Sequence, residues 1–163
     1  MPGIQIVGVG GFLGSNLFKY FSKQNYLTFG TSHQKHLADS PRISFLDLLN
    51  PDFEFLKEKA SSFQFSILCS GETTIDKCKT EIEISEALNV THTIQLIENL
   101  WLNKITPVFI SSDMVFDGKR GGYSEYDTCG PITQYGKQKR CVEEYLIASN
   151  KPWLIVRLCK VFD

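Results

Sequence analysis

Hydrophobic positions along the chain follow two alternating periods from one end to the other. Short apolar runs rich in β-branched residues predict six strands, near Gln5–Gly8, Leu27–Thr31, Ser44–Leu46, Phe65–Cys69, Pro107–Ser111 and Leu154–Leu158. Longer stretches with apolar residues every three or four positions predict helices, near Phe12–Lys23, Asp52–Ser61, Ile82–Leu102 and Thr133–Ser149. Such alternation predicts an α/β fold, a Rossmann-like doubly wound parallel sheet with helices on both faces and ligands at the carboxyl ends of its strands.

Turn-forming residues and spacing refine this picture. The helix near Ile82–Leu102 is expected to present Ala87, Val90, Ile94, Ile97 and Trp101 on one face, with the Ile94–Trp101 stripe forming core or a subunit interface. The Gly-, Asp- and Tyr-rich stretch Asp117–Pro131 predicts a long functional loop. No linker divides the 163 residues, so residues 1–163 are expected to form one domain.

A glycine-rich turn follows the first predicted strand. Gly8, Gly11 and Gly14 are each three residues apart, and the amphipathic helix begins at Phe12 and Leu13. Glycines in this context permit a tight turn and close approach of the backbone to a pyrophosphate. The exposed N–H groups at the start of the helix would bind the phosphates. The sequence therefore predicts a dinucleotide site here.

A second motif combines a tyrosine, a lysine and a serine. Tyr135 and Lys139 are four residues apart, so a helix would place them on one face, and Ser111-Ser112 ends the preceding strand. These groups could protonate a carbonyl oxygen while hydride reaches its carbon. A lysine about 4 Å away would lower the tyrosine pKa. Without the glycine turn, an ordinary exposed lysine–tyrosine pair would explain the spacing equally well.

Composition narrows the function classes. A net charge of -1 provides no basic field for nucleic acid, and no apolar run is long enough to span a membrane. The five cysteines have no paired spacing, and the three histidines lack ligand-like companions. We therefore expect reduced thiols, no metal site and a cytoplasmic protein that binds neither nucleic acid nor membranes.

With these residues in view, the chain resembles the extended short-chain dehydrogenase/reductase superfamily, and most closely the dTDP-4-dehydrorhamnose reductases. The segments that carry the resemblance span nearly the whole chain: Gly8–Gly14, Leu46–Leu48, Cys69–Gly71, Thr74–Cys78, Ser111–Gly118, Tyr123–Glu125 and Tyr135–Lys139. The resemblance implies that Ser112, Tyr135 and Lys139 form the catalytic trio, with Ser112 preferred to Ser111 by counting back from Val115-Phe116. Lys139 would also hold the nicotinamide ribose.

The same resemblance assigns the cofactor contacts. Gly8, Gly11 and Gly14 would line the pyrophosphate, with Phe12 and Leu13 beginning the helix behind it. Asp47 and Leu48 would border the adenine, and Cys69, Ser70 and Gly71 would run along the middle of the cofactor. Gly71 departs from the alanine that is usual in the family.

Cofactor choice is read from the stretch after the second strand. Gly30–Lys35 contains no carboxylate for a ribose 2′-hydroxyl, whereas Ser32, His33 and Lys35 could donate to a 2′-phosphate. This favours NADP over NAD, although His33 and Lys35 are equally consistent with solvated loop residues.

The resemblance implies an NADP-dependent reductase of a nucleotide-linked 4-keto-6-deoxy sugar, with a homodimer as a candidate assembly. Family enzymes continue well beyond Asp163 into a substrate domain, so the chain is expected to be an engineered truncation, a fragment or a natural remnant that binds cofactor without turnover. One alternative is a non-catalytic NADP-binding subunit, because the β subunit of methionine adenosyltransferase looks similar through the same motifs. A sugar-nucleotide epimerase or dehydratase is a third candidate.

Overall fold

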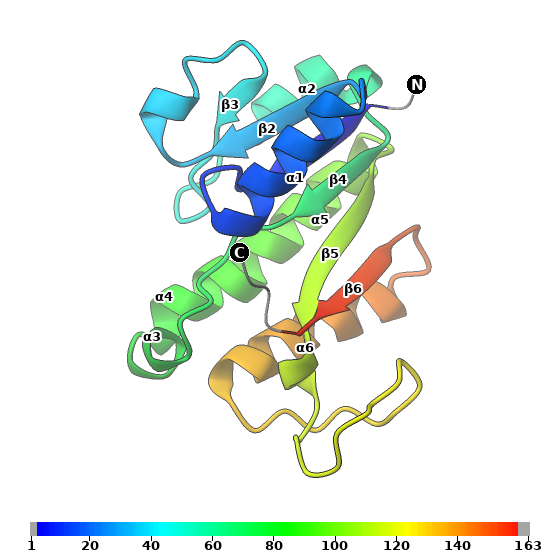
Figure 1. Cartoon of the computed structure of the whole chain (residues 1–163). Coiled ribbons are helices and arrows are strands. Elements are labelled where there is room, and N and C mark those ends of the chain that lie inside the picture. Colours follow the sequence, from blue (N-terminus) through cyan, green and yellow to red (C-terminus); the bar gives the residue numbers. More distant parts are fainter. Residues whose placement is uncertain (1–2, 160–163) are drawn as a thin grey trace.

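The computed structural model describes residues 3–159, without the side chains of residues 57, 59 and 60. The strands are β1 (Ile4–Val7), β2 (Thr28–Ser32), β3 (Ile43–Phe45), β4 (Phe65–Leu68), β5 (Thr106–Ser112) and β6 (Leu154–Leu158). They form one parallel sheet in the order β3-β2-β1-β4-β5-β6 (Figure 1). The strand order reverses at β1 and β4, which is where sheets of this kind bind ligands. The predicted Rossmann-like fold is confirmed.

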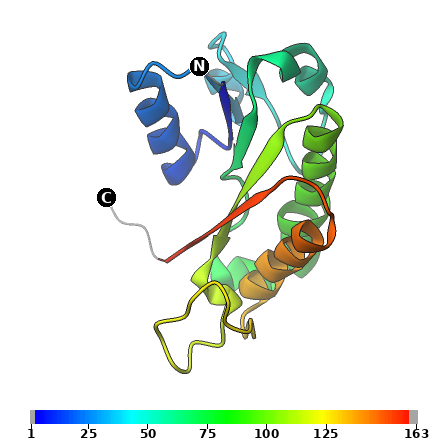
Figure 2. The same cartoon turned by 90° about the vertical axis from the view of Figure 1, so that its right-hand side faces the viewer.

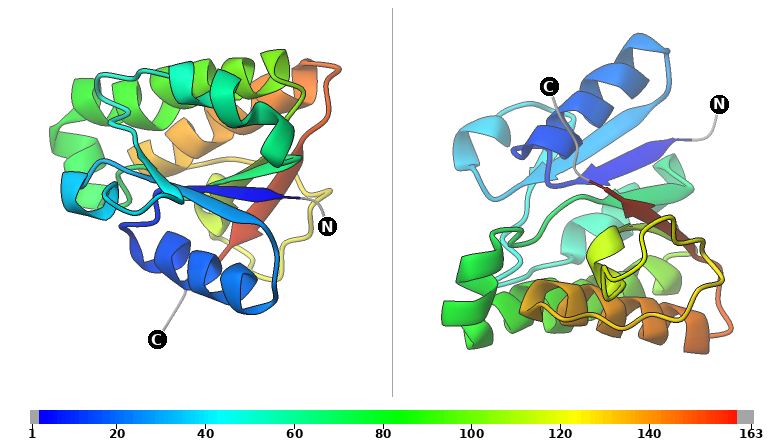
Figure 3. Two further views of the ribbon diagram at one scale, coloured as in Figure 1. Left: turned by 90° about the horizontal axis from the view of Figure 1, so that it is seen from above. Right: turned by 60° about the horizontal axis from the view of Figure 1, so that its bottom comes forward.

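Helices cover both faces of this sheet. They are α1 (Phe12–Lys23), α2 (Glu54–Lys59), α3 (Ile75–Thr80), α4 (Ile82–Glu86), α5 (His92–Leu102) and α6 (Gln134–Ala148). Single turns occur at η1 (Lys35–Leu37), η2 (Ala60–Ser62), η3 (Ala87–Thr91) and η4 (Asp113–Val115). Helix α1 lies on one face, and α2, α5 and α6 lie on the other (Figures 2 and 3).

Alternation along β1 explains the two core layers. Ile4 and Ile6 pack under α1 against Leu17 and Phe18. Val7 points to the opposite face, because successive strand residues alternate in direction. There it joins a larger cluster under α2, α5 and α6, formed by Leu46, Leu48, Leu56, Phe63, Leu68, Val90, Leu96, Ile97, Leu100, Ile105, Phe109, Val142 and Leu146.

The long helix predicted over Ile82–Leu102 is interrupted. α4 and α5 are joined by η3, a π-helical turn that adds a residue to the ordinary helical repeat. The buried face of α5 therefore carries Leu96, Ile97 and Leu100, whereas the predicted Ile94 and Trp101 are only half-buried. Ile94 and Trp101 nevertheless pack against the main core, so the predicted stripe forms core, whereas the prediction of one uninterrupted helix was wrong. The short helix α3 was not predicted.

Candidate active site

The glycine turn joins the end of β1 to the start of α1. The amides of Gly8 and Val9 donate to the Thr31 carbonyl at 3.0 and 2.9 Å, and the Gly11 amide donates to the Gly8 carbonyl at 3.1 Å. A Cβ on Gly14 would lie 2.2 Å from the Gly8 carbonyl oxygen, so only glycine permits this approach of helix to strand. The first-turn amides of α1 precede any intrahelical partner and can serve a phosphate.

A pocket of about 260 Å³ opens beside this turn, between the carboxyl ends of β1, β2 and β4 and the segment after β3. We call it the glycine-turn pocket; it is lined by Val7, Gly8, Gly10, Gly11, Thr31, His33, Leu46, Asp47, Leu48, Leu49, Cys69, Ser70, Gly71 and Leu88. Eight residues predicted for cofactor binding are among them. The close approach at Gly14 and the pocket position fit a dinucleotide whose phosphates meet α1.

The remaining predicted cofactor residues lie outside the lining of this pocket. The Ser32 hydroxyl is buried and accepts the Gln34 amide at 3.0 Å, so it stabilises the turn after β2. The Lys35 ammonium lies 5.9 Å from the centre of the Phe45 ring. Phe12 and Leu13 begin α1 and can contribute their backbone amides.

Ser112 ends β5, and Tyr135 and Lys139 lie in α6, which packs against that strand. Tyr135 and Lys139 lie one turn apart in the first half of α6, which packs against β5 and η4. The Lys139 Nζ donates to the Ile110 carbonyl at 3.0 Å and lies 5.7 Å from the Tyr135 ring centre. Ser112 lies two residues beyond Ile110, where its Oγ accepts the Met114 amide at 3.2 Å. All three residues are at least nine-tenths buried.

Burial controls ionisation at this corner. It lowers the pKa of Lys139 to about 8. It also raises the pKa of Tyr135 to about 12, with smaller contributions in the same direction from Cys78 and Asp113. Our expectation that Lys139 would lower the Tyr135 pKa is therefore wrong for the protein alone. The ammonium is directed at the Ile110 carbonyl, and the removal of the phenol from water disfavours the tyrosinate.

Cys69 is a thiol that lines the glycine-turn pocket. Burial raises its pKa to about 12, against the opposing effect of the Lys139 ammonium. A thiolate is the reactive form of cysteine, so Cys69 acts as a small neutral filler.

Helix α6 is fastened to β6 by a buried ion pair. The Glu143 side chain is completely buried, and its two oxygens accept the Arg157 Nε and Nη2 at 2.9 and 2.8 Å. Burial opposes ionisation, but the hydrogen bonds and the charge of Arg157 lower the pKa of Glu143 below its ordinary value. The pair fixes α6 against β6, the strand beside β5, and so fixes the corner that holds Tyr135 and Lys139.

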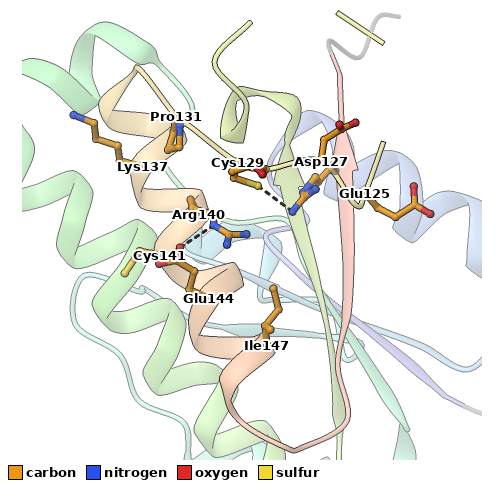
Figure 4. Close-up of a pocket in the computed structure, with 11 residues that line it drawn as sticks. Glu125, Asp127, Cys129, Pro131, Lys137, Arg140, Cys141, Glu144 and Ile147 are labelled. Carbon is orange, nitrogen blue, oxygen red and sulfur yellow. Dashed lines mark hydrogen bonds and ion pairs between the residues drawn. The ribbon is translucent and has the colours of Figure 1, made fainter. Parts of the chain in front are cut away.

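A polar pocket, which we call the α6 pocket, lies beside a face of α6 that does not include Tyr135 or Lys139 (Figure 4). Its volume is about 650 Å³, and Arg140 turns there to bind Glu144 at 2.9 Å. Three basic and three acidic residues line it: Lys137, Arg140, Arg157, Glu125, Asp127 and Glu144. Tyr135 and Lys139 are not part of the lining, and the mixed charges provide no field of one sign for a substrate.

The predicted loop after η4 is held by its own side chains. The Tyr123 hydroxyl donates to Asp117 at 2.5 Å, its ring stacks on Phe116 with 4.4 Å between centroids, and Arg120 pairs with Asp127 at 2.8 Å. Between this loop and β6 lies a pocket of about 930 Å³ that also reaches Asp113, next to Ser112. We call it the β6 pocket. Its aromatic lining and its place beside the trio make it a candidate substrate site.

Two buried amides beside the trio were missed by sequence reasoning. Asn89 lies on η3, and Gln138 directly precedes Lys139 on α6; both are 2% exposed. Their Nδ2 and Oε1 atoms are 2.9 Å apart. No local signal in the sequence singles out either one, because Gln138 stands among lysines and Asn89 in a stretch of mixed polar and apolar residues.

Within the described part of the chain, no helix is long and apolar enough to cross a membrane. The same residues contain no group of three or more His, Cys, Asp or Glu side chains that could hold a metal ion.

Comparison with known proteins agrees with the family resemblance that the sequence motifs indicated. A family model described as the RmlD substrate binding domain matches residues 2–163. The chain belongs to the RmlD substrate binding domain family. The likeness to dTDP-4-dehydrorhamnose reductases that the motifs indicated is thereby confirmed.

Three members and neighbours of the RmlD family illustrate the relationship. A dTDP-4-dehydrorhamnose reductase of Aggregatibacter actinomycetemcomitans is 29% identical over 163 residues, 99% of this chain and 52% of that protein. Methionine adenosyltransferase 2 subunit beta of Mus musculus is 27% identical over 157 residues, 95% of this chain and 46% of that protein. The crystal structure of a hypothetical dTDP-4-dehydrorhamnose reductase from Sulfolobus tokodaii matches with a TM-score of 0.82 and 26% identity, covering 98% of this chain and 56% of that one. The chain spans about half the length of the curated relatives it matches.

Proposed function

We propose that residues 1–163 are the dinucleotide-binding part of an NADP-dependent reductase that acts on a nucleotide-linked 4-keto-6-deoxy sugar. The observation that carries this proposal is the meeting of Tyr135 and Lys139 with the end of β5, in a sheet whose glycine turn opens a separate pocket at the same edge. The names of the reductase relatives supply the substrate class.

Ser112, Tyr135 and Lys139 would each have a separate role in the reduction of the substrate carbonyl. The bound cofactor supplies the hydride. Tyr135 stays protonated near neutral pH, because burial raises its pKa to about 12, and so it is ready to donate its proton to the oxygen. The Ser112 hydroxyl would donate to the same oxygen as its charge develops. Lys139 would bind the ribose hydroxyls and stabilise the tyrosinate that remains.

The preference for NADP rests on the residues after β2. His33 lines the glycine-turn pocket, and the stretch Gly30–Lys35 carries no carboxylate that would repel a 2′-phosphate. NAD stays the alternative, since Ser32 and Lys35 are occupied by contacts with the turn and with Phe45.

A second function is favoured by one specific likeness. Methionine adenosyltransferase 2 subunit beta matches this chain over nearly its whole length, so a non-catalytic subunit that binds NADP and a partner protein is the alternative. A sugar-nucleotide epimerase or dehydratase is less favoured, because the Val115–Gly118 and Tyr123–Glu125 motifs resemble the reductase branch.

The deciding experiment uses the intact gene product. NADPH oxidation with a dTDP-4-keto-6-deoxy sugar is expected for the wild type, and Tyr135→Phe should reduce the rate about 10²- to 10⁴-fold because it removes the proton donor. Tight NADPH binding without turnover in either protein would instead support the subunit. Residues 1–163 alone should bind NADPH and turn over nothing; appreciable reduction by this chain would contradict the expectation that residues outside it are needed to complete the substrate site.

A further inference from the structure

Gln138 connects the catalytic helix to the helix that faces it. Its Nε2 donates to the Ser85 hydroxyl of α4 at 2.9 Å, and its Oε1 accepts the Asn89 Nδ2 of η3 at 2.9 Å. Gln138 lies between Tyr135 and Lys139 in sequence and is 2% exposed. A buried glutamine with both ends of its amide bonded fixes distances that an apolar side chain would leave adjustable.

Asn89 extends this connection to the backbone after β4. Its Oδ1 accepts the Glu72 amide at 2.8 Å, and its Nδ2 donates to the Glu72 carbonyl at 2.9 Å. One carboxamide thus binds both polar groups of a single backbone residue. The second proton of the Asn89 Nδ2 group goes to Gln138, so the orientation of the amide depends on that acceptor.

The segment held by Asn89 is a wall of the glycine-turn pocket. Gly71, directly before Glu72, lines that pocket and has a φ of +145°, which L side chains rarely adopt. A Cβ on Gly71 would lie 2.8 Å from the Asn89 Oδ1. Glycine at this position therefore avoids both a strained φ and this close contact. The π-helical turn η3 brings Asn89 into this position, and its neighbour Leu88 lines the same pocket.

We propose that Gln138 is a positioning residue that holds the Ser70–Glu72 wall of the glycine-turn pocket in register with Tyr135 and Lys139. The chain of hydrogen bonds from Gln138 through Asn89 to Glu72 sets how the middle of a bound dinucleotide lies relative to the catalytic groups. The inference rests on the proposed dinucleotide function and deepens it. The adenosine end of the pocket, near His33 and Asp47, has no part in this connection.

The test compares Gln138→Met with Gln5→Met. Gln5 is also buried, and it accepts one buried hydrogen bond, from the Ser66 hydroxyl at 2.8 Å, but it lies in β1 away from α6. Both variants lose a buried amide and keep an unbranched side chain. Affinities of residues 1–163 for NADPH and for 2′,5′-ADP, which carries only the adenosine end, are measured by calorimetry. Hydrogen exchange of the Glu72 amide is measured without ligand.

Gln138→Met should weaken NADPH binding about tenfold, the effect expected when one buried hydrogen bond is lost, and leave 2′,5′-ADP within about twofold. Its Glu72 amide should exchange at least about tenfold faster. Gln5→Met should change neither the affinity ratio nor the exchange at Glu72. If Gln138→Met does not fold, Gln138→Asn, which is too short to reach both partners, replaces it.

Equal loss of both ligands in the two variants, or unchanged protection of Glu72 in Gln138→Met, would overturn the role of Gln138. Failure of the wild type to bind either ligand would overturn the proposed function instead. The exchange measurement needs no cofactor and decides the positioning role in that case as well.

Discussion

The two ends of the candidate site, the glycine-turn pocket and the corner between β5 and α6, consist of different kinds of groups. The glycine-turn pocket is made of backbone and small residues, and its shape depends on the close contact between Gly14 and the Gly8 carbonyl. The corner between β5 and α6, the proposed catalytic end, is made of buried ionisable side chains, with Lys139 on the Ile110 carbonyl and Glu143 on Arg157. The first end should therefore be sensitive to added volume, whereas the second should be sensitive to lost charge and hydrogen bonds.

Removing the cation from the Glu143–Arg157 pair should have the largest effect. Arg157→Met leaves a carboxylate whose side chain is completely buried without its main partner, and we expect a loss of about 3–5 kcal/mol in the free energy of unfolding. The double variant with Glu143→Met should recover most of this loss, since it removes the buried carboxylate, which Arg140 alone would otherwise pair at 3.2 Å. Urea denaturation measures both; a loss below about 1 kcal/mol for Arg157→Met would contradict the description of this corner.

The same pair predicts a pH dependence. The pKa of Glu143 is lowered in the folded protein, so its stabilising contribution is present above the ordinary value of 4.5 and is lost as the pH falls through the folded pKa. Denaturation at pH 7 and at pH 4 should show a smaller difference for Glu143→Met than for the wild type. Equal differences in the two proteins would be the contrary result.

An added methyl group should disrupt the glycine-turn end of the site. Gly14→Ala places a methyl group 2.2 Å from a backbone oxygen and should cost about 3 kcal/mol, because neither helix nor strand can move easily. Gly11→Ala is the matched control, since its Cβ would meet only the Gly8 oxygen at an ordinary 3.6 Å. We expect Gly11→Ala to fold normally but to bind NADPH more weakly, because Gly11 lines the pocket. Thermal melting and NADPH titration separate the two outcomes; similar melting for both variants would argue against the close contact.

Lys139 should give opposite pH trends for stability and activity. Its folded pKa of about 8 lies below the ordinary 10.5, so the unfolded chain binds more protons between these values and stability should rise with pH there, relative to Lys139→Met. Reduction by the intact protein should fall about tenfold per pH unit above about 8, as the ammonium is lost. Denaturation and kcat/KM profiles test the two signs, and a flat activity profile up to pH 10 would exclude a role for the charge.

The smallest expected change concerns cofactor choice. His33→Ala removes a side chain that lines the glycine-turn pocket after β2. If it binds the 2′-phosphate, the preference for NADPH over NADH should drop by about threefold to tenfold, within the range of a single exposed polar contact. Paired titrations measure the ratio. Lys35→Ala serves as the control, because Lys35 faces the Phe45 ring and should leave the ratio unchanged.

The contrast also explains what could be read from the sequence. The succession of strands and helices along the chain, the glycine turn and the Tyr135–Lys139 spacing follow from local backbone rules. They were therefore predicted close to their true positions. The Asn89–Gln138 contact was not predicted, because it depends on residues about 50 positions apart meeting in the fold, and the π-helical turn was not predicted because no spacing rule distinguishes it from regular helix. The Tyr135 pKa was misjudged for the same reason: charge spacing is visible in a sequence, whereas burial is not.

The central claim is that one dinucleotide spans both ends of the site. Backbone NMR of residues 1–163 titrated with NADPH tests it most directly. We predict that the amide signals of Gly8, Gly11 and Gly71 shift together with those of Tyr135 and Lys139, at one common dissociation constant. Shifts confined to the glycine-turn pocket, or none at either end, would contradict the account.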